Sequence, residues 1–152
     1  MKITNALLAE HAVFHNLFDH MERMTPRLKT LGEVKVMAEL LESLLEAHSH
    51  AEDDLVMEPL DHCLEQIGQR ELFDEEHKTI DQSVRQAQSA KSAKLARKHL
   101  LGAVIASRKH FDKEERIIFP LAEKHLSERT LESLGKAWLK RREGAPGHKQ
   151  AA

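Results

Sequence analysis

Residues 48–60 have the sequence HSHAEDDLVMEPL, and residues 110–121 have the similar sequence HFDKEERIIFPL. Each stretch contains a histidine and a glutamate four residues apart, followed by an acidic residue, an apolar run and a proline. Residues four apart lie one turn apart on the same face of a helix. A Glu-His dipeptide precedes each stretch, at residues 10–11 and 76–77. The sequence therefore predicts two copies of a helix pair, related by a pseudo-two-fold axis.

The composition limits the fold and the partners. The chain has 152 residues with only six glycines and four prolines, and 32% of its residues are charged. This composition suits long helices and leaves too few turn residues for a β-sandwich or barrel. The net charge of −2 argues against a nucleic-acid partner, and no apolar run approaches the roughly 18 residues of a membrane span. Because no signal-peptide pattern is present, we expect a cytoplasmic protein without membrane contact.

The few helix-breaking residues divide the chain into helix-length segments. We expect four helices, over residues 4–24, 31–63, 70–89 and 93–125. Pro59 and Pro120 lie near the ends of two of them, and each is expected to kink or break its helix there. Four long helices with short connections predict an antiparallel up-down-up-down four-helix bundle over residues 1–126.

The last part of the chain carries a different pattern. Ser127 is expected to begin a short C-terminal helix over residues 127–143, and residues 144–152 are expected to form a disordered tail. Four basic residues of this helix are expected to form a solvated face: Lys136, Lys140, Arg141 and Arg142.

Polar residues interrupt the apolar stripes of all four predicted helices. Apolar residues recur every three or four positions, as the buried face of a helix requires. Six polar residues occupy positions where this period demands apolar ones: His11, His48, Glu52, His77, His110 and Glu114. A buried ionised carboxylate costs several kcal/mol unless it is paired or coordinates a metal. Six uncompensated groups would unfold a domain whose total stability is about 5–15 kcal/mol, so we predict one or more metal ions in the bundle core.

Two further residues join these as candidate ligands. A single His-x-x-x-Glu sequence is more often a surface ion pair, but two copies in core register, facing two more core histidines, favour a metal site. His15 lies four residues after His11, and Asp81 lies four residues after His77, at the edge of the stripe. His50 lies 200° around the helix from His48 and is expected to face solvent. Imidazole and carboxylate ligands without thiolate suit iron, manganese or zinc.

The arrangement of histidine on the first and third helices, and His-x-x-x-Glu on the second and fourth, resembles the hemerythrin-like HHE cation-binding family. The resemblance covers about residues 3–125 and implies a non-haem centre with two iron ions. It also implies terminal ligands and two bridging carboxylates: His11, His48, His77 and His110, with Glu52 and Glu114. The chain departs from oxygen-carrying hemerythrins at Asp81, which replaces a second histidine. His15 would restore the ligand count at the other iron.

The resemblance implies an open coordination position that accepts dioxygen, nitric oxide or peroxide. Three functions are consistent with such a centre. The first is a protein that binds or senses dioxygen or nitric oxide, which we favour. The second is a di-iron oxidase or a peroxide-scavenging enzyme, and the third is an iron storage or handling protein. The changed ligand set argues against reversible oxygen carriage.

Overall fold

The computed structural model describes residues 1–144. This part of the chain forms helices and turns without any β-strand, which confirms the predicted all-helical class. Within it, no helix has both the length and the apolar character that crossing a membrane requires. The predicted disordered tail lies outside the described residues, apart from Gly144, which directly follows the last helix.

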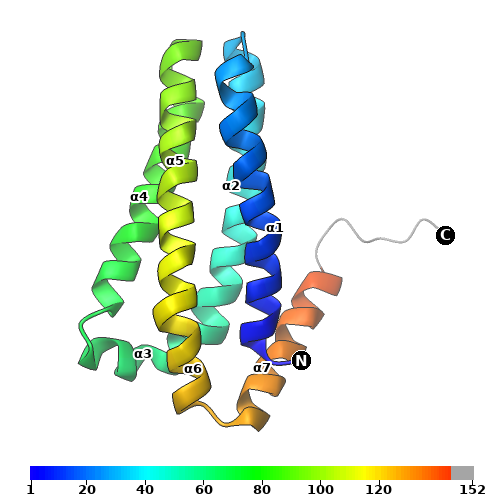
Figure 1. Cartoon of the computed structure of the whole chain (residues 1–152), viewed down its shortest axis with the longest axis vertical. Coiled ribbons are helices and arrows are strands. Elements are labelled where there is room, and N and C mark those ends of the chain that lie inside the picture. The colour runs from blue at the N-terminus through cyan, green and yellow to red at the C-terminus, as the bar shows by residue number, and fades with distance from the viewer. Residues whose placement is uncertain (145–152) are drawn as a thin grey trace, which may run out of the picture.

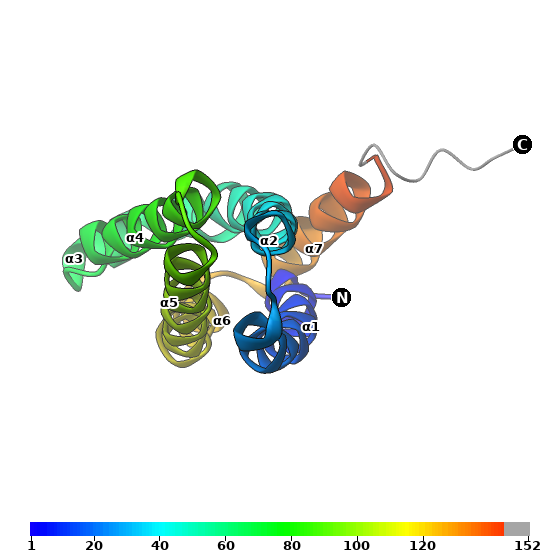
Figure 2. The same ribbon diagram turned by 90° about the horizontal axis from the view of Figure 1, so that it is seen from above.

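Four long helices lie side by side: α1 (Ile3–Met24), α2 (Leu31–Glu52), α4 (Arg70–Ser89) and α5 (Ala93–Lys113). In Figure 1 the chain rises through α1, descends through α2, rises through α4 and descends through α5. Figure 2 shows the four grouped around a common interior when viewed from above. A short 3-10 helix, η1 (Thr25–Arg27), and a brief turn connect α1 to α2.

Side-chain caps explain why two of the helices begin where the sequence predicts. Thr30 precedes α2 and accepts a hydrogen bond from the backbone N–H of Glu33, whose carboxylate accepts one from the N–H of Thr30. Ser92 precedes α5 and accepts a hydrogen bond from the N–H of Leu95. Each such cap stabilises a helix by about 0.5–2 kcal/mol.

Two widened helical turns differ from the predicted kinks. α2 continues through a π-helical turn, η2 (Asp53–Met57), into α3 (Glu58–Gln66), so this helical segment passes the predicted end at residue 63. α5 continues in the same way through η3 (Glu114–Ile118) into α6 (Phe119–His125).

The two prolines give the physical reason for these turns. Proline has no N–H to donate, and its ring clashes with the carbonyl four residues earlier. Those carbonyls belong to Leu55 for Pro59 and to Arg116 for Pro120, and both residues lie inside the π-helical turns. The backbone therefore widens about one turn before each proline, directly after Glu52 in the first copy of the repeat and from Glu114 onward in the second.

The apolar core consists of two clusters, one toward each end of the long helices. One contains Phe18, Leu41, Val84 and Leu100 among others, and the second contains Ile3, Leu7, Phe73 and Ile118 among others. On α1, the buried His11 lies between Leu7 of the second cluster and Phe14 of the first. Fully burying one large apolar side chain contributes about 1.5–3 kcal/mol to the stability of the fold. The two clusters therefore stabilise the bundle on either side of the buried polar residues.

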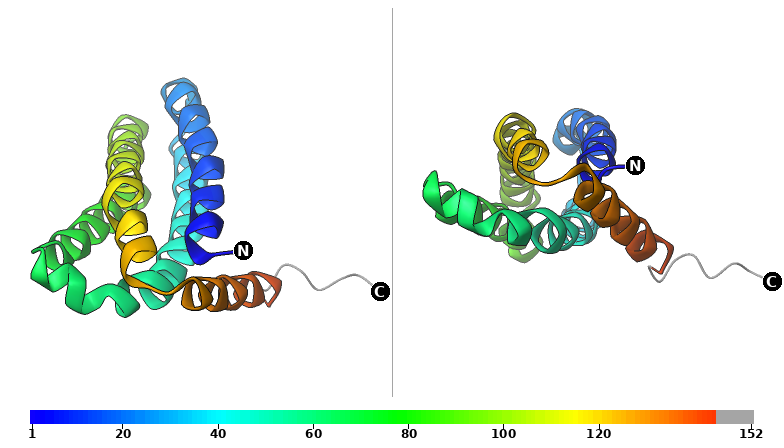
Figure 3. Two further views of the ribbon diagram at one scale, coloured as in Figure 1. Left: turned by 60° about the horizontal axis from the view of Figure 1, so that its bottom comes forward. Right: turned by 90° about the horizontal axis from the view of Figure 1, so that it is seen from below.

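Helix α7 (Glu128–Glu143) packs against α1 and extends outward from the base of the bundle (Figure 3). Ser127 caps its start by accepting a hydrogen bond from the N–H of Thr130 at 3.1 Å. Leu131 is buried in the second apolar cluster. Gly135 lies so close to the backbone of Met1 that a Cβ atom would overlap the Met1 carbonyl. The absence of a side chain at residue 135 therefore lets α7 approach the start of α1.

Candidate metal centre

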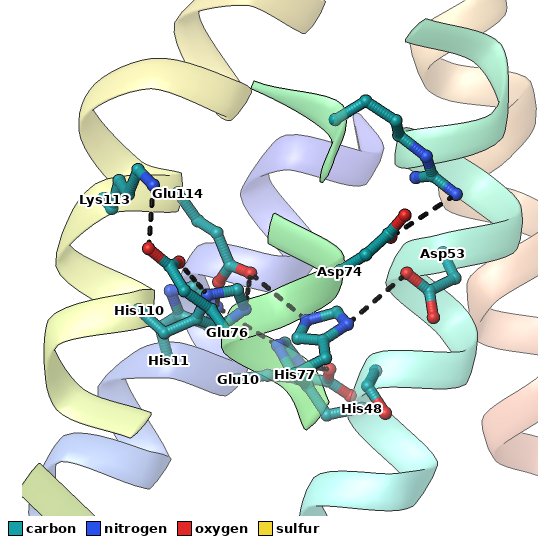
Figure 4. A network of polar contacts seen from close by, with 12 residues as sticks. Glu10, His11, His48, Asp53, Asp74, Glu76, His77, His110, Lys113 and Glu114 are labelled. Carbon is teal, nitrogen blue, oxygen red and sulfur yellow. Dashed lines mark hydrogen bonds and ion pairs between the residues drawn. The ribbon is translucent and has the colours of Figure 1, made fainter. Parts of the chain in front are cut away.

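The structure brings six of the eight predicted ligand side chains together in two groups. Glu52, His77, His110 and Glu114 form one group, and His11, His48 and Glu114 form the other. Within each group, one ligand atom from every residue lies within 4.8 Å of the others. The side chains come from all four long helices and from η3. Figure 4 shows five of them converging between the helices: His11, His48, His77, His110 and Glu114. Glu114 is the member that the two groups share.

Two of the histidines are oriented by glutamates on neighbouring helices. The Nδ1–H of His48 donates a hydrogen bond to Oε2 of Glu10 at 2.7 Å. The Nδ1–H of His110 donates to Oε2 of Glu76 at 2.8 Å. An ionised carboxylate only accepts hydrogen bonds, so it fixes a proton on Nδ1. Burial acts to lower the pKa of His110, but contacts with Glu114 and Glu76 outweigh burial and raise that pKa, so its Nε2 would release a proton on binding a metal. Both rings therefore present Nε2 to the interior as a potential metal ligand.

The other two histidines, His11 and His77, face the carboxylates of the residues that directly follow Glu114 and Glu52. The Nδ1–H of His11 donates to Oε1 of Glu115 at 2.9 Å. His77 Nδ1 lies 3.7 Å from Oδ1 of Asp53, an ion-pair distance rather than a hydrogen bond. All four core histidines thus have a carboxylate behind them, in the arrangement that orients metal-binding histidines in general.

The two core carboxylates are completely buried, and none of their four oxygens has a hydrogen bond of good geometry. Glu114 Oε1 lies 2.5 Å from His110 Nε2, and Oε2 lies 3.3 Å from His11 Nε2. Burial and the neighbouring charge of Glu114 raise the pKa of Glu52 well above its usual value. Burial also acts to raise the pKa of Glu114, but its contacts with the histidines outweigh burial and hold that pKa well below the usual value.

The facing nitrogens of His11 and His48 test whether a cation fits this site. Their Nε2 atoms lie 3.2 Å apart, and both Nδ1 atoms face carboxylates. Burial lowers the pKa of His48, which favours its neutral form. Two neutral rings with protonated Nδ1 atoms point two lone pairs at each other, which is unfavourable unless a cation or a proton lies between them. The donor set therefore fits a metal ion, with buried carboxylate oxygens completing the coordination.

His15 and Asp81 lie outside both groups, so the structure does not bring them to the other six. His15 Nε2 lies 3.4 Å from Oε1 of Glu115, the carboxylate that also binds His11. Its Nδ1 lies 3.5 Å from the Arg108 guanidinium. Asp81 is exposed and lines a cavity beside the centre. The two residues thus surround the site without contributing to the ligand groups.

That cavity has a volume of about 140 Å³ and lies between α2, α4 and α5. Its walls include His48, His77 and His110, together with Asp53 and Asp81. Since a water molecule occupies about 30 Å³ of liquid, the cavity accommodates a few waters or one small molecule. His77 is the most exposed of the four core histidines, with 19% of its side chain accessible. A small ligand therefore has an approach to the centre on the His77 side.

The supporting carboxylates and their basic partners were not predicted as functional residues. Glu10 and Glu76 belong to the Glu-His repeat, and Asp53 and Glu115 follow the two core glutamates, so the repeat itself contained this signal. The predicted solvated basic face of the last helix is wrong for Arg142, which is partly buried, whereas Arg141 is exposed as predicted and also forms an ion pair. Arg142 pairs with Glu10 at 2.6 Å, and Arg141 pairs with Asp54 at 2.8 Å. No local pattern indicated these contacts, because the partners lie far apart in the sequence.

Comparison with known proteins finds no relative. No protein-family model matches the sequence, no curated protein matches it, and no solved structure matches the chain. The chemistry of the site therefore has to be argued from the residues of this chain alone.

Proposed function

We propose that this chain is a hemerythrin-like metal-binding protein, built as an antiparallel up-down-up-down four-helix bundle. In this proposal the core holds a pair of carboxylate-bridged, non-haem iron ions, and the protein binds or senses dioxygen or nitric oxide. One observation carries the proposal: imidazole nitrogens and the oxygens of two fully buried carboxylates converge between the helices, and none of the four carboxylate oxygens has a hydrogen bond of good geometry. A cation is the simplest compensation for such a group.

The ligand groups favour two positions for ions rather than one. His11 and His48 would hold one ion, and His77 and His110 would hold the other. Glu114 belongs to both groups and is suited to bridge the ions, whereas Glu52 lies with the His77 and His110 group. The pseudo-two-fold repeat gives each position a pair of histidines from two helices, each with a carboxylate behind its ring.

The charge of the site also suits two dications. Six carboxylates take part, namely the two core glutamates and four supporting residues: Glu10, Glu52, Asp53, Glu76, Glu114 and Glu115. Lys113 and Arg142 pair with two of the supporting carboxylates. With neutral histidines, the six carboxylates are balanced by the two basic residues and two dications, so the site has no net charge. A single dication would leave an excess of negative charge at the partly buried site.

Iron is the proposed metal because the ligands are imidazoles and carboxylates, and zinc and manganese would accept the same set. When bound, a ferrous pair supplies an open coordination position and electrons for a diatomic ligand. The chain itself positions the histidines through their Nδ1 hydrogen bonds. The ring of His11 stacks on Phe111 with centroids 4.0 Å apart, which restricts its rotation.

The size of the cavity supports a small ligand. A volume of about 140 Å³ beside His77 and His110 accommodates a diatomic gas or peroxide. Asp53 and Asp81 line this cavity and make it polar, so it would hold water when no ligand is present. This favours dioxygen, nitric oxide or peroxide over larger molecules as the species that reaches the centre.

The test is an optical titration of reduced, iron-loaded protein with dioxygen or nitric oxide in an anaerobic cell. The proposal predicts a stable absorption change that saturates with the gas and is absent from Glu114→Ala, which lacks the shared ligand. His50→Ala is the matched control: His50 lies in the cavity wall but belongs to neither ligand group, so the variant should reach the same saturated absorption change as the wild type. Rapid peroxide turnover above that of free iron, without a stable gas adduct, would favour the enzyme hypothesis instead.

A further inference from the structure

Two of the supporting glutamates, Glu10 and Glu76, are each bound by a basic residue, but the two basic residues come from different parts of the chain. Lys113 Nζ donates a hydrogen bond to Oε1 of Glu76 at 2.8 Å, while Oε2 of Glu76 accepts from His110. Lys113 directly precedes Glu114 in the second copy of the repeat, and the equivalent residue before Glu52 is alanine. Ala51 is buried and has no charge. The first copy therefore lacks a basic residue of its own at this position.

Helix α7 supplies the missing charge. The Nε–H of Arg142 donates to Oε1 of Glu10 at 2.7 Å, and its Nη2 lies 2.6 Å from the same oxygen. The indole N–H of Trp138, one turn earlier on α7, also donates to this oxygen at 3.1 Å. Arg142 Nη1 donates to the carbonyl of Ala47 on α2 at 3.1 Å. One carboxylate oxygen thus receives three contacts from α7, which leaves the other oxygen to His48.

This contact differs from an ordinary surface ion pair. Exposed pairs contribute little because water screens them and both side chains lose entropy. Here only 17% of the Glu10 side chain is accessible, and the carboxylate lies between a nearly buried histidine and α7. Burial acts to raise the pKa of Glu10, but the His48 hydrogen bond and Arg142 outweigh it and hold the pKa below its usual value. The α7 contacts to Oε1 therefore hold the Glu10 carboxylate in place and leave Oε2 aligned on Nδ1 of His48.

We propose that α7 is a structural part of the metal centre, in which Arg142 and Trp138 are positioning residues that hold Glu10 and, through it, His48. This inference rests on the metal centre of the proposed function. The His11 and His48 position depends on the appended helix, whereas the His77 and His110 position takes the corresponding charge from Lys113 within the bundle. Removal of the α7 contacts would weaken one metal position and leave the other intact.

Cobalt(II) is the probe for the test, since its visible absorption reports the coordination of each bound ion. Metal-free full-length protein is titrated with cobalt, and the affinity and spectrum of each equivalent are recorded. Loss of a residue that supports a metal ligand lowers metal affinity by about 10- to 100-fold. We expect Arg142→Ala to weaken one of two equivalents by this factor and to change its spectrum. Trp138→Phe, which keeps an aromatic ring but loses the indole N–H, should have a smaller effect of the same kind.

Three variants distinguish positioning from a general effect on folding. Arg141→Ala is the matched control, because Arg141 is the adjacent residue on α7 but pairs with Asp54 instead of Glu10. It should bind both equivalents like the wild type. Arg142→Lys restores the charge without the paired donors and should recover part of the lost affinity. Lys113→Ala should weaken the other equivalent, with a different spectral change.

The decisive variant combines Arg142→Ala with His48→Ala. The inference predicts that His48→Ala alone loses one equivalent, and that adding Arg142→Ala leaves the affinity of the remaining equivalent unchanged. A further loss at that equivalent would overturn the inference, and so would wild-type cobalt binding by Arg142→Ala. If the wild type binds no cobalt, the proposed metal centre itself fails, and this inference fails with it.

Discussion

The His77 and His110 half of the centre takes its supporting groups from the bundle, whereas the His11 and His48 half takes one of them from α7. The halves also differ in accessibility. The His11 side chain is fully buried and is held by Glu115 at 2.9 Å, while His77 is partly exposed and lies 3.7 Å from Asp53. The repeated sequence thus produces one half in which His11 is fully buried and one half in which His77 is partly exposed. In the proposed metal centre, a small ligand would reach the His77 half more easily than His11.

The largest expected effect is at the residue that belongs to both halves. Glu114→Ala should lose both metal ions, because Glu114 contributes to both ligand groups. Glu52→Ala should lose only the ion at the His77 and His110 position, since Glu52 belongs to that group alone. Elemental analysis of the purified variants measures this difference. Equal loss in the two variants would contradict the distinct bridging role of Glu114.

The docking of α7 offers the next largest effect. In Gly135→Ala the new methyl group would overlap the Met1 carbonyl, so α7 has to shift away from α1. Overpacking of this kind costs about 1–3 kcal/mol, measurable as a lower free energy of unfolding, and cobalt affinity should fall at the same single position as in Arg142→Ala. Gly102→Ala on α5 is the control, because nothing lies within 4 Å of its new Cβ. Unchanged cobalt binding in a destabilised Gly135→Ala protein would separate α7 docking from the metal centre.

The pH dependence of the metal-free protein tests the buried carboxylate pair. Burial and Glu114 raise the pKa of Glu52 well above 4.5, so the folded state retains a proton that the unfolded chain releases. The contribution of this proton to the free energy of unfolding is fully present below about pH 4.5. It is lost as the pH rises through the higher pKa that Glu52 has in the folded state. Glu52→Gln resembles the protonated form and cannot lose that proton. In thermal unfolding of chelator-treated proteins, the wild type should lose stability relative to Glu52→Gln as the pH rises; parallel curves would refute the pairing.

The smallest expected effects concern the two predicted ligands outside the groups. His15→Ala should retain both ions, with at most a few-fold weaker binding at the His11 position, because Glu115 is the only supporting carboxylate that His15 contacts. Asp81→Ala should keep the full metal content and change only the rate at which a small ligand enters the cavity. Stopped-flow mixing with nitric oxide would measure that rate. Loss of one metal ion from either variant would instead indicate that the substituted residue is a metal ligand.

The sequence predicted the six converging side chains because their helical period and their duplication agreed. His48 and Glu52, like His110 and Glu114, lie four residues apart within an apolar stripe, so a buried stripe carries both inward. His15 and Asp81 were less determined. A step of four residues turns a side chain about 40° around the helix axis, and at the edge of the stripe this rotation is enough to leave the ligand face.

Other features depend on contacts that no local pattern encodes. Arg142 meets Glu10 across 132 positions of the sequence, and an exposed helical face was the natural expectation for a basic cluster at the end of a helix. The π-helical turns were also not predicted by the spacing of the apolar residues. Their signal was the proline that follows each core glutamate, which indicated an irregularity but placed it one turn too late.

The most direct measurement is the metal content of wild-type protein purified without added metal or chelator, determined by elemental analysis alongside protein concentration. The paired ligand groups and the charge of the site predict two iron ions per chain. A single zinc ion per chain, or protein that contains no metal and binds none when iron is supplied, would contradict a di-iron centre.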